Sequence, residues 1–112
     1  MSGEALARLD ELAAMHDDWD GEGALAPTAA ALAAARQVLE RLEGMAIRPI
    51  RPVPSSPEPH RVAPGPCGEV VLEWEIGGIY LECECAEDGR IEWMHEIGGH
   101  TTHWEWPRRE EV

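Results

Sequence analysis

The sequence predicts an α+β fold in which an N-terminal αα-hairpin packs on one face of a four-stranded antiparallel β-meander. Two observations indicate this fold. Apolar residues recur at helical spacing within the Ala- and Leu-rich residues 1–45, as they do in amphipathic helices. Residues 67–106 alternate apolar and polar side chains between glycine-containing turns that recur about every ten residues, which is typical of short antiparallel strands. We therefore expect the 112 residues to form a single domain of two layers.

The helical hairpin is predicted from two apolar stripes, which are separated by a loop of turn-forming residues, 17–23. Pro27 suits the first turn of the second helix, and Thr28 suits a capping role there. Gly44 fits the position just after a helix end. The stripes are Leu6, Leu9, Leu12, Ala13 and His16 in the first helix, and Thr28, Leu32, Ala35, Leu39 and Leu42 in the second, with Val38 beside it.

Residues 46–66 are rich in proline, which favours extended or polyproline II backbone and excludes a helix. They leave room for one edge strand, but we expect them to serve mainly as a connector between the helical hairpin and the sheet. Residues 107–112 are expected to form a tail beyond the last strand.

Turn lengths fix the register of the predicted meander. A two-residue Gly77-Gly78 loop, a three-residue loop over 87–89 and a two-residue Gly98-Gly99 loop place apolar residues opposite one another on neighbouring strands. A shift by one residue would move these side chains to the other face, so the register is strongly specified and the helices should pack here. The opposed pairs include Leu72–Cys83, Trp74–Leu81, Cys85–Ile91, Cys83–Trp93, Leu81–His95, Trp93–Trp104 and Ile91–Trp106.

The same register gathers glutamates on the opposite face of the sheet, with Arg90 as the only base near its edge. Like charges directly opposite on neighbouring strands cost roughly 0.2–1 kcal/mol a pair, and glutamate is a poor strand former. One interpretation is a solvated face that keeps the protein in solution, and the other is a surface that meets positive charge on a partner. The predicted partner-binding residues are Glu73, Glu75, Tyr80, Glu82, Glu84, Glu92, Glu96 and Glu105.

The overall charge limits the classes of partner. The chain carries 22 acidic residues against 9 basic ones, for a formal net charge of −13. Such a surface repels nucleic-acid phosphates and anionic lipid, so we expect neither direct nucleic-acid binding nor membrane binding. No apolar run reaches the roughly 20 residues of a membrane-spanning helix. Cys83 and Cys85 are too close for an ordinary disulfide, and the three cysteines favour a reduced, cytoplasmic location.

A metal site is an alternative use of the glutamate-rich face. Glu84, Glu92, Glu105 and His103 would lie on adjacent strands and suit a hard or borderline cation. Zinc held by cysteine and histidine is not expected, because Cys83 and Cys85 belong to the core face whereas His103 belongs to the other. We therefore expect no cofactor.

The segment from Asp18 to Gly23 resembles the opening of an EF-hand calcium loop. Ala29, however, stands where calcium needs a bidentate glutamate. We instead expect a turn in which the aspartates cap backbone groups and Trp19 holds the hairpin to the sheet.

The tryptophans allow two interpretations. Those of the last segment fall on the predicted core face, so a tryptophan-rich core is the simpler one. The alternative is that some of them line a groove or a homodimer surface, since two short helices need not cover four strands. The tryptophans concerned are Trp74, Trp93, Trp104 and Trp106.

Signals for catalysis are weak. The serines lie in terminal or Pro-rich segments, and the chain has no nucleophile-elbow pattern and no Gly-rich phosphate loop. Paired carboxylates occur only on an open sheet face rather than in an inferable pocket. We expect the protein not to be an enzyme.

Two motifs carry a resemblance to a known group of proteins. The sequence Asp18-Trp19-Asp20-Gly21-Glu22-Gly23-Ala24 and the later Gly68-Glu69-Val70-Val71-Leu72-Glu73-Trp74 resemble an uncharacterised family of short bacterial proteins with a DWDGxGA loop, a Pro-rich middle and a GxxxLEW strand. The resemblance spans residues of about 12–106 and implies a small bacterial cytoplasmic protein, in some cases one half of a two-gene module. It implies no activity and no site residues.

These observations lead to three hypotheses of different classes. The first is a small acidic protein-binding module that neutralises or regulates a basic partner, as an antitoxin or immunity protein does, and that imitates nucleic acid if the partner binds it. The partner would be encoded by a neighbouring gene, and complementary charge would speed its association. The second is a metal-binding protein or metal-dependent enzyme that uses the same face. The third is a self-associating accessory domain.

Overall fold

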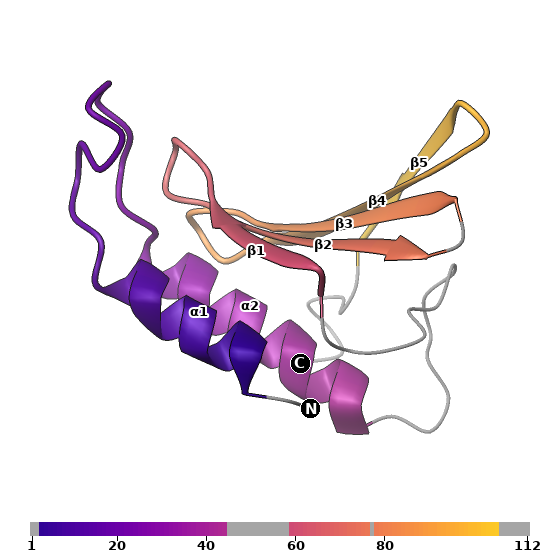
Figure 1. The fold of residues 1–112 in the computed structure, drawn as a ribbon, viewed down its shortest axis with the longest axis horizontal. Helices are drawn as coiled ribbons and strands as arrows, with labels where there is room; N and C mark the ends of the chain where they lie inside the picture. Colours follow the sequence, from indigo (N-terminus) through magenta and orange to yellow (C-terminus); the bar gives the residue numbers. More distant parts are fainter. Residues whose placement is uncertain (1–2, 45–58, 77, 106–112) are drawn as a thin grey trace.

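A computed structural model describes residues 3–44, 59–76 and 78–105 of the chain. Two helices, α1 (Glu4–Ala13) and α2 (Ala29–Gly44), precede five strands. The two helices lie side by side under one face of a twisted antiparallel sheet (Figure 1). The strands are β1 (Arg61–Pro64), β2 (Val70–Ile76), β3 (Ile79–Cys85), β4 (Ile91–Ile97) and β5 (His100–Trp104).

The prediction of four strands is wrong by one, because β1 adds a fifth strand to the edge of the meander. It lies within residues 46–66, which we expected to serve mainly as a connector; residues 45–58 lie outside the described part of the chain. Two short-range features explain this strand. Val62 pairs with Leu72 and is buried in the core, and the Gly65 N–H donates to the Glu69 carbonyl across the turn to β2 at 2.9 Å.

The predicted register of the other strands is confirmed. Among the described residues, the ladders run from Val70–Cys85 to Ile76–Ile79, from Tyr80–Glu96 to Cys85–Ile91, and from Trp93–Trp104 to Ile97–His100. Gly89, at the predicted bulge position, has a positive φ of 89°, a conformation that side chains other than glycine rarely adopt. The predicted Ile91–Trp106 pair lies outside the described residues, which end at residue 105.

The core lies between the helices and the apolar face of the sheet. It joins most of the two predicted stripes to the inward positions of the strands, so that burial of apolar surface holds the two layers together. Ala13 and His16, which were predicted to belong to the first stripe, are exposed instead, because α1 ends at Ala13. Trp93 stacks between Trp74 and Trp104, with ring centroids 5.4 Å and 6.0 Å away, a favourable spacing for aromatic pairs. The largest fully buried side chains are Trp93, Leu9, Leu12, Leu39, Leu42, Leu72, Leu81, Val38, Val70 and Cys83.

The start of α2 is fixed by its cap. Because the helix begins at Ala29, Pro27 precedes it rather than occupying its first turn as predicted. Thr28 takes the expected capping role, since its Oγ1 accepts a hydrogen bond from the Ala31 N–H at 3.0 Å. The same hydroxyl donates to the Glu87 carbonyl at 2.8 Å, which ties the helix to the turn between β3 and β4.

Backbone hydrogen bonds hold the loop between the helices against the turn between β1 and β2. The Leu25 N–H donates to the Pro66 carbonyl at 2.9 Å, and the Thr28 N–H donates to the Gly68 carbonyl at 3.0 Å. Leu25 and Cys67 form an isolated parallel bridge. The helical layer is therefore joined to the sheet by its connecting loop as well as by the core.

The edge of the sheet at β1 is covered in part by α1. Arg8 Nε donates to the Val62 carbonyl at 3.2 Å, so a carbonyl on the outer strand is satisfied within the molecule. A partly covered edge is protected from pairing with another chain. Among the described residues, no helix is both long and apolar enough to cross a membrane.

Candidate functional site

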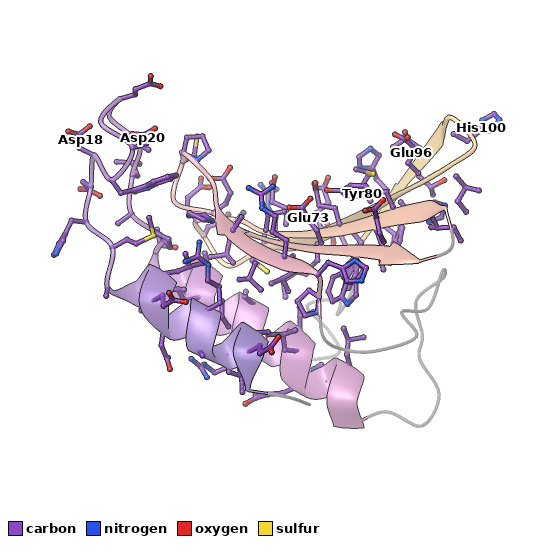
Figure 2. All side chains as sticks on the ribbon, viewed as in Figure 1. Asp18, Asp20, Glu73, Tyr80, Glu96 and His100 are labelled. Atoms are coloured by element: carbon purple, nitrogen blue, oxygen red, sulfur yellow. The ribbon has the colours of Figure 1, made fainter. Side chains whose placement is uncertain are left out.

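The face of the sheet opposite the helices carries the predicted glutamates. Register pairs bring Glu73, Glu82, Met94 and His103 into one row across β2 to β5. Figure 2 shows Glu73, Tyr80 and Glu96 on the side of the sheet that faces away from α1 and α2. We call this surface the acidic face, which comprises Glu73, Glu75, Tyr80, Glu82, Glu84, Glu92 and Glu96.

Like charges oppose one another on the acidic face as predicted, within Glu73–Glu82 and Glu84–Glu92. Glu105 differs from its prediction. The pairing of β4 with β5 starts at Trp93–Trp104, one residue short of the expected pair of Glu92 with Glu105. Glu105 is an exposed residue just beyond β5, outside the ladder that organises the other six glutamates.

Tyr80 joins two of these glutamates. Its hydroxyl lies 2.7 Å from Glu73 Oε1 and 2.8 Å from Glu82 Oε1. A phenol has one hydrogen to donate, so it satisfies only one of the two carboxylates at a time. Burial of the phenol, followed by its hydrogen bonds to the two carboxylates, raises the pKa of Tyr80 far above its ordinary value of 10.0. Tyr80 therefore stays protonated and remains a donor.

Arg61 supplies a positive charge to this cluster. Its Nη1 lies 3.4 Å from Glu73 Oε2, and Arg61 is directly opposite Glu73 in the register. The prediction that Arg90 is the only base of the face is therefore wrong, because the contact of Arg61 depends on β1, which was not predicted as a strand. The signal in the sequence that could have predicted this strand is the alternation of Arg61 with Val62, next to the glycine-flanked turn at 65–68.

A shallow hollow of about 130 Å³ lies at the other end of the acidic face, over β3 to β5. In it His103 Nδ1 lies 3.7 Å from Glu92 Oε1. Partial loss of hydration, and then the charges of neighbouring glutamates, raise the pKa of Glu84 above its ordinary value of 4.5. The residues lining the hollow are Glu82, Glu84, Glu92, Trp93, Met94 and His103.

The alternative metal ligands do not form a set. In the part of the chain that the structure describes, no three His, Cys, Asp or Glu side chains are grouped so that they could hold a metal ion. Glu84, Glu92, Glu105 and His103 are all within that part. Cys83 and Cys85 are free and fully buried on the core face, and burial raises the pKa of the Cys83 thiol, which makes it a poor thiolate ligand.

The loop at 17–24 uses its carboxylates to hold its own backbone. Asp18 Oδ1 accepts from the Gly23 N–H at 2.7 Å, and Asp20 Oδ1 accepts from the N–H groups of Glu22 and Ala24 at 2.8 and 3.1 Å. These bonds lower the pKa of Asp20. The expected turn with capping aspartates is therefore found. Trp19 Nε1 donates to the Leu25 carbonyl at 2.9 Å, so it holds the loop to itself rather than directly to the sheet.

The two motifs that carry the resemblance meet in space. Leu25 directly follows the Asp18–Ala24 motif and bridges Cys67, and the Gly68 carbonyl that begins the second motif accepts from Thr28. Gly68 has a φ of 90°, and a Cβ there would lie 3.3 Å from the Ala26 carbonyl oxygen. The pairing of these motifs in one sequence therefore has a structural reason, the junction of the loop with the sheet.

Comparison with known proteins adds no further identification. No family model matches the chain, and neither the curated proteins nor the solved structures include a match.

Proposed function

We propose that this protein is a non-enzymatic binding module that neutralises or regulates a basic protein partner through the acidic face. The observation that carries the proposal is the register, which brings like-charged glutamates of neighbouring strands directly opposite one another. Such an arrangement costs stability in the free protein. A partner that supplies positive charge would offset that cost, as in an antitoxin or immunity protein.

The scarcity of positive charge on the acidic face supports the same proposal. Among the described residues, Arg61 is paired with Glu73 at one end, and His103 lies near Glu92 at the other. Between them, the glutamates of β3 and β4 form no ion pair with an arginine within the part of the chain that the structure describes. A solvated face usually interleaves both signs of charge, so the pattern favours a surface that is complementary to a basic one.

Tyr80 indicates what part of a partner would fit best. Because its hydroxyl donates to only one of Glu73 and Glu82 at a time, the oxygen of the other carboxylate is an acceptor that receives no hydrogen from Tyr80. An arginine guanidinium offers several N–H donors in a planar fork and also stacks on aromatic rings. We therefore expect an arginine of the partner to contact Tyr80 and the neighbouring carboxylates.

The test is binding of the product of the neighbouring gene after co-expression. Reversal of Glu82 and Glu84 to arginine (Glu82→Arg with Glu84→Arg) should weaken binding by at least about a hundredfold, since it replaces two attractive contacts with two repulsive ones. The matched control is Glu22→Arg with Glu40→Arg, which changes the net charge equally at exposed positions of the loop and α2. Calorimetry at two salt concentrations would measure both affinities.

Binding by the control should stay within about threefold of wild type and weaken with salt. Equal loss in both double variants would mean that net charge alone matters. Undiminished binding by the Glu82/Glu84 variant, with its circular dichroism spectrum unchanged, would contradict the proposal.

A further inference from the structure

The two edges of the sheet are protected to different extents. At one edge, β1 is four residues long and includes Pro64, which has no N–H to offer a further strand. Arg8 of α1 also donates to the Val62 carbonyl at this edge. Short strands, prolines and covering side chains all hinder pairing with another chain. At the other edge, β5 pairs with β4 alone among the described residues.

The residues of β5 leave this second edge open. Its five residues include no proline, lysine or acidic residue, and the first four of them are exposed. The helices contact the sheet mainly at β1 to β3, and β5 projects beyond them (Figure 1). Ile97, which pairs with His100 of β5, is 44% exposed. An open edge of this kind can accept an extended segment of another protein as an added strand.

The register indicates which backbone groups of β5 point outward. In an antiparallel pair, successive residues alternate between bonding to the neighbouring strand and facing away from it. The two-residue turn between β4 and β5 makes its flanking pair, Ile97 with His100, a bonded one. The N–H and C=O groups of Thr101 and His103 therefore face away from β4. Their side chains lie on the acidic side of the sheet, because Thr101 opposes Glu96 in the register.

Charge determines what fits beside this edge. A residue directly opposite Thr101 or His103 on an added antiparallel strand has its side chain on the same side of the sheet as theirs. Neighbouring strands lie about 4.8 Å apart, so a long basic side chain there can approach the exposed carboxylates of Glu92 and Glu96 on β4. A second copy of the chain would instead bring another acidic face and a further net charge of −13.

We propose that β5 accepts an extended segment of the basic partner as a further strand of the sheet. Basic side chains of this segment lie over the acidic face, and they alternate with apolar side chains that lie on the other face, beside Ile97, Thr102 and Trp104. Backbone hydrogen bonds supply affinity, and the alternation of side chains supplies specificity. The positive charge of the partner is taken from the proposed function, on which this proposal rests.

The test uses synthetic peptides as probes of the full chain. The alternating peptide is acetyl-Arg-Val-Arg-Val-Arg-Val-Arg-amide, and its matched control has the same composition with all the arginines first. Calorimetry at about 0.15 M salt measures affinity, and NMR measures hydrogen exchange. We expect the alternating peptide to bind at least about fivefold more tightly than the control. It should also slow exchange of the Thr101 and His103 N–H groups about tenfold or more.

Two methylated forms of the alternating peptide test the hydrogen bonds directly. In an extended strand the N–H groups of the arginines point to one side and those of the valines to the other. N-methylation of the set that meets β5 should weaken binding about tenfold or more, whereas N-methylation of the other set should have little effect. Loss with methylated arginines indicates antiparallel pairing, and loss with methylated valines indicates parallel pairing.

A variant of β5 provides the complementary test. Thr101→Pro removes an outward N–H and keeps the pairing of β5 with β4, so it should weaken binding about tenfold or more. Thr101→Ala, which keeps the N–H, is the matched control and should bind as wild type does. The methylated peptides keep the test valid if Thr101→Pro fails to fold.

Equal binding of the alternating and control peptides, or equal effects of the two methylated forms, would overturn the placement at β5. If Glu82→Arg with Glu84→Arg still weakened binding of these peptides, the proposed function would stand without that placement. Absence of peptide binding would also overturn the placement, and the product of the neighbouring gene would then test the proposed function alone. A dimer of the free protein that Thr101→Pro abolishes would assign the edge to a second copy instead.

Discussion

Thr28 joins the start of α2 to two turns of the sheet. Its hydroxyl caps α2 and donates to the Glu87 carbonyl, and its backbone N–H donates to the Gly68 carbonyl. The capping role could be predicted from the position of the threonine before an apolar stripe. The contact with Glu87 could not, because it joins residues separated by 59 positions, and only the packed arrangement of α2 on the sheet brings them together.

Replacement of Thr28 by alanine should lower the free energy of unfolding by about 1–3 kcal/mol, because the cap is lost and the Glu87 carbonyl loses a donor. Urea denaturation would measure the change. Thr28→Ser, which keeps the hydroxyl, should restore most of the stability, and Thr101→Ala at an exposed position of β5 should have little effect. A Thr28→Ala variant as stable as wild type would show that the cap is dispensable.

At the scale of elements, the sequence patterns predicted the helical hairpin and the register of four strands. Glycine turns of fixed length leave one register that buries the apolar positions, and that constraint acts locally. The sequence left room for the fifth strand at the edge but did not favour it, because prolines surround its four residues of strand pattern. Without this strand, the sequence did not predict that Arg61 lies beside Glu73. The hydrogen bonds of Tyr80 could not be predicted either, because they depend on the conformations of the side chains and not on the register of the strands.

Strand β1 should contribute to stability through Val62, which is 7% exposed and pairs with Leu72. Val62→Ala should reduce the free energy of unfolding by roughly 1–3 kcal/mol, because it removes buried methyl groups and leaves a small cavity. Chemical denaturation would measure the change. The control Thr102→Ala alters an exposed position of the opposite edge strand. Equal stability of the two variants would mean that β1 contributes strand pairing but that its buried side chain does not stabilise the core.

For the whole molecule, two carboxylates with shifted pKa values, Glu84 and Asp20, have opposite effects on stability as the pH changes. The pKa of Glu84 is raised, so the folded state binds this proton more tightly than the unfolded chain. Its contribution is complete below its ordinary value of 4.5 and is lost as the pH rises through the folded-state pKa. The pKa of Asp20 is lowered, so its contribution is present above its ordinary value of 3.8 and is lost as the pH falls further.

We therefore expect greater stability in mildly acidic solution than at neutral pH. As the pH rises above 4.5, the ordinary value for Glu84, the free energy of unfolding of the wild-type protein should decrease. Glu84→Gln should flatten this decrease because glutamine does not titrate. Urea denaturation at fixed ionic strength and several pH values would measure both profiles. Parallel profiles of the wild-type and Glu84→Gln proteins would contradict the role assigned to Glu84. The control is Glu40→Gln, at an exposed position of α2, which should leave the profile unchanged.

The order of strands in the sheet, in which each strand pairs with its neighbour in the chain, has a consequence for how the protein folds. Each hairpin closes only a short loop, and short loops cost little chain entropy, so the meander can form by successive closures. The hydrogen bond from Thr28 to Glu87 instead closes a loop of 59 residues. Local contacts are associated with rapid folding. The expected sequence of events is pairing of the strands first and docking of the helices last.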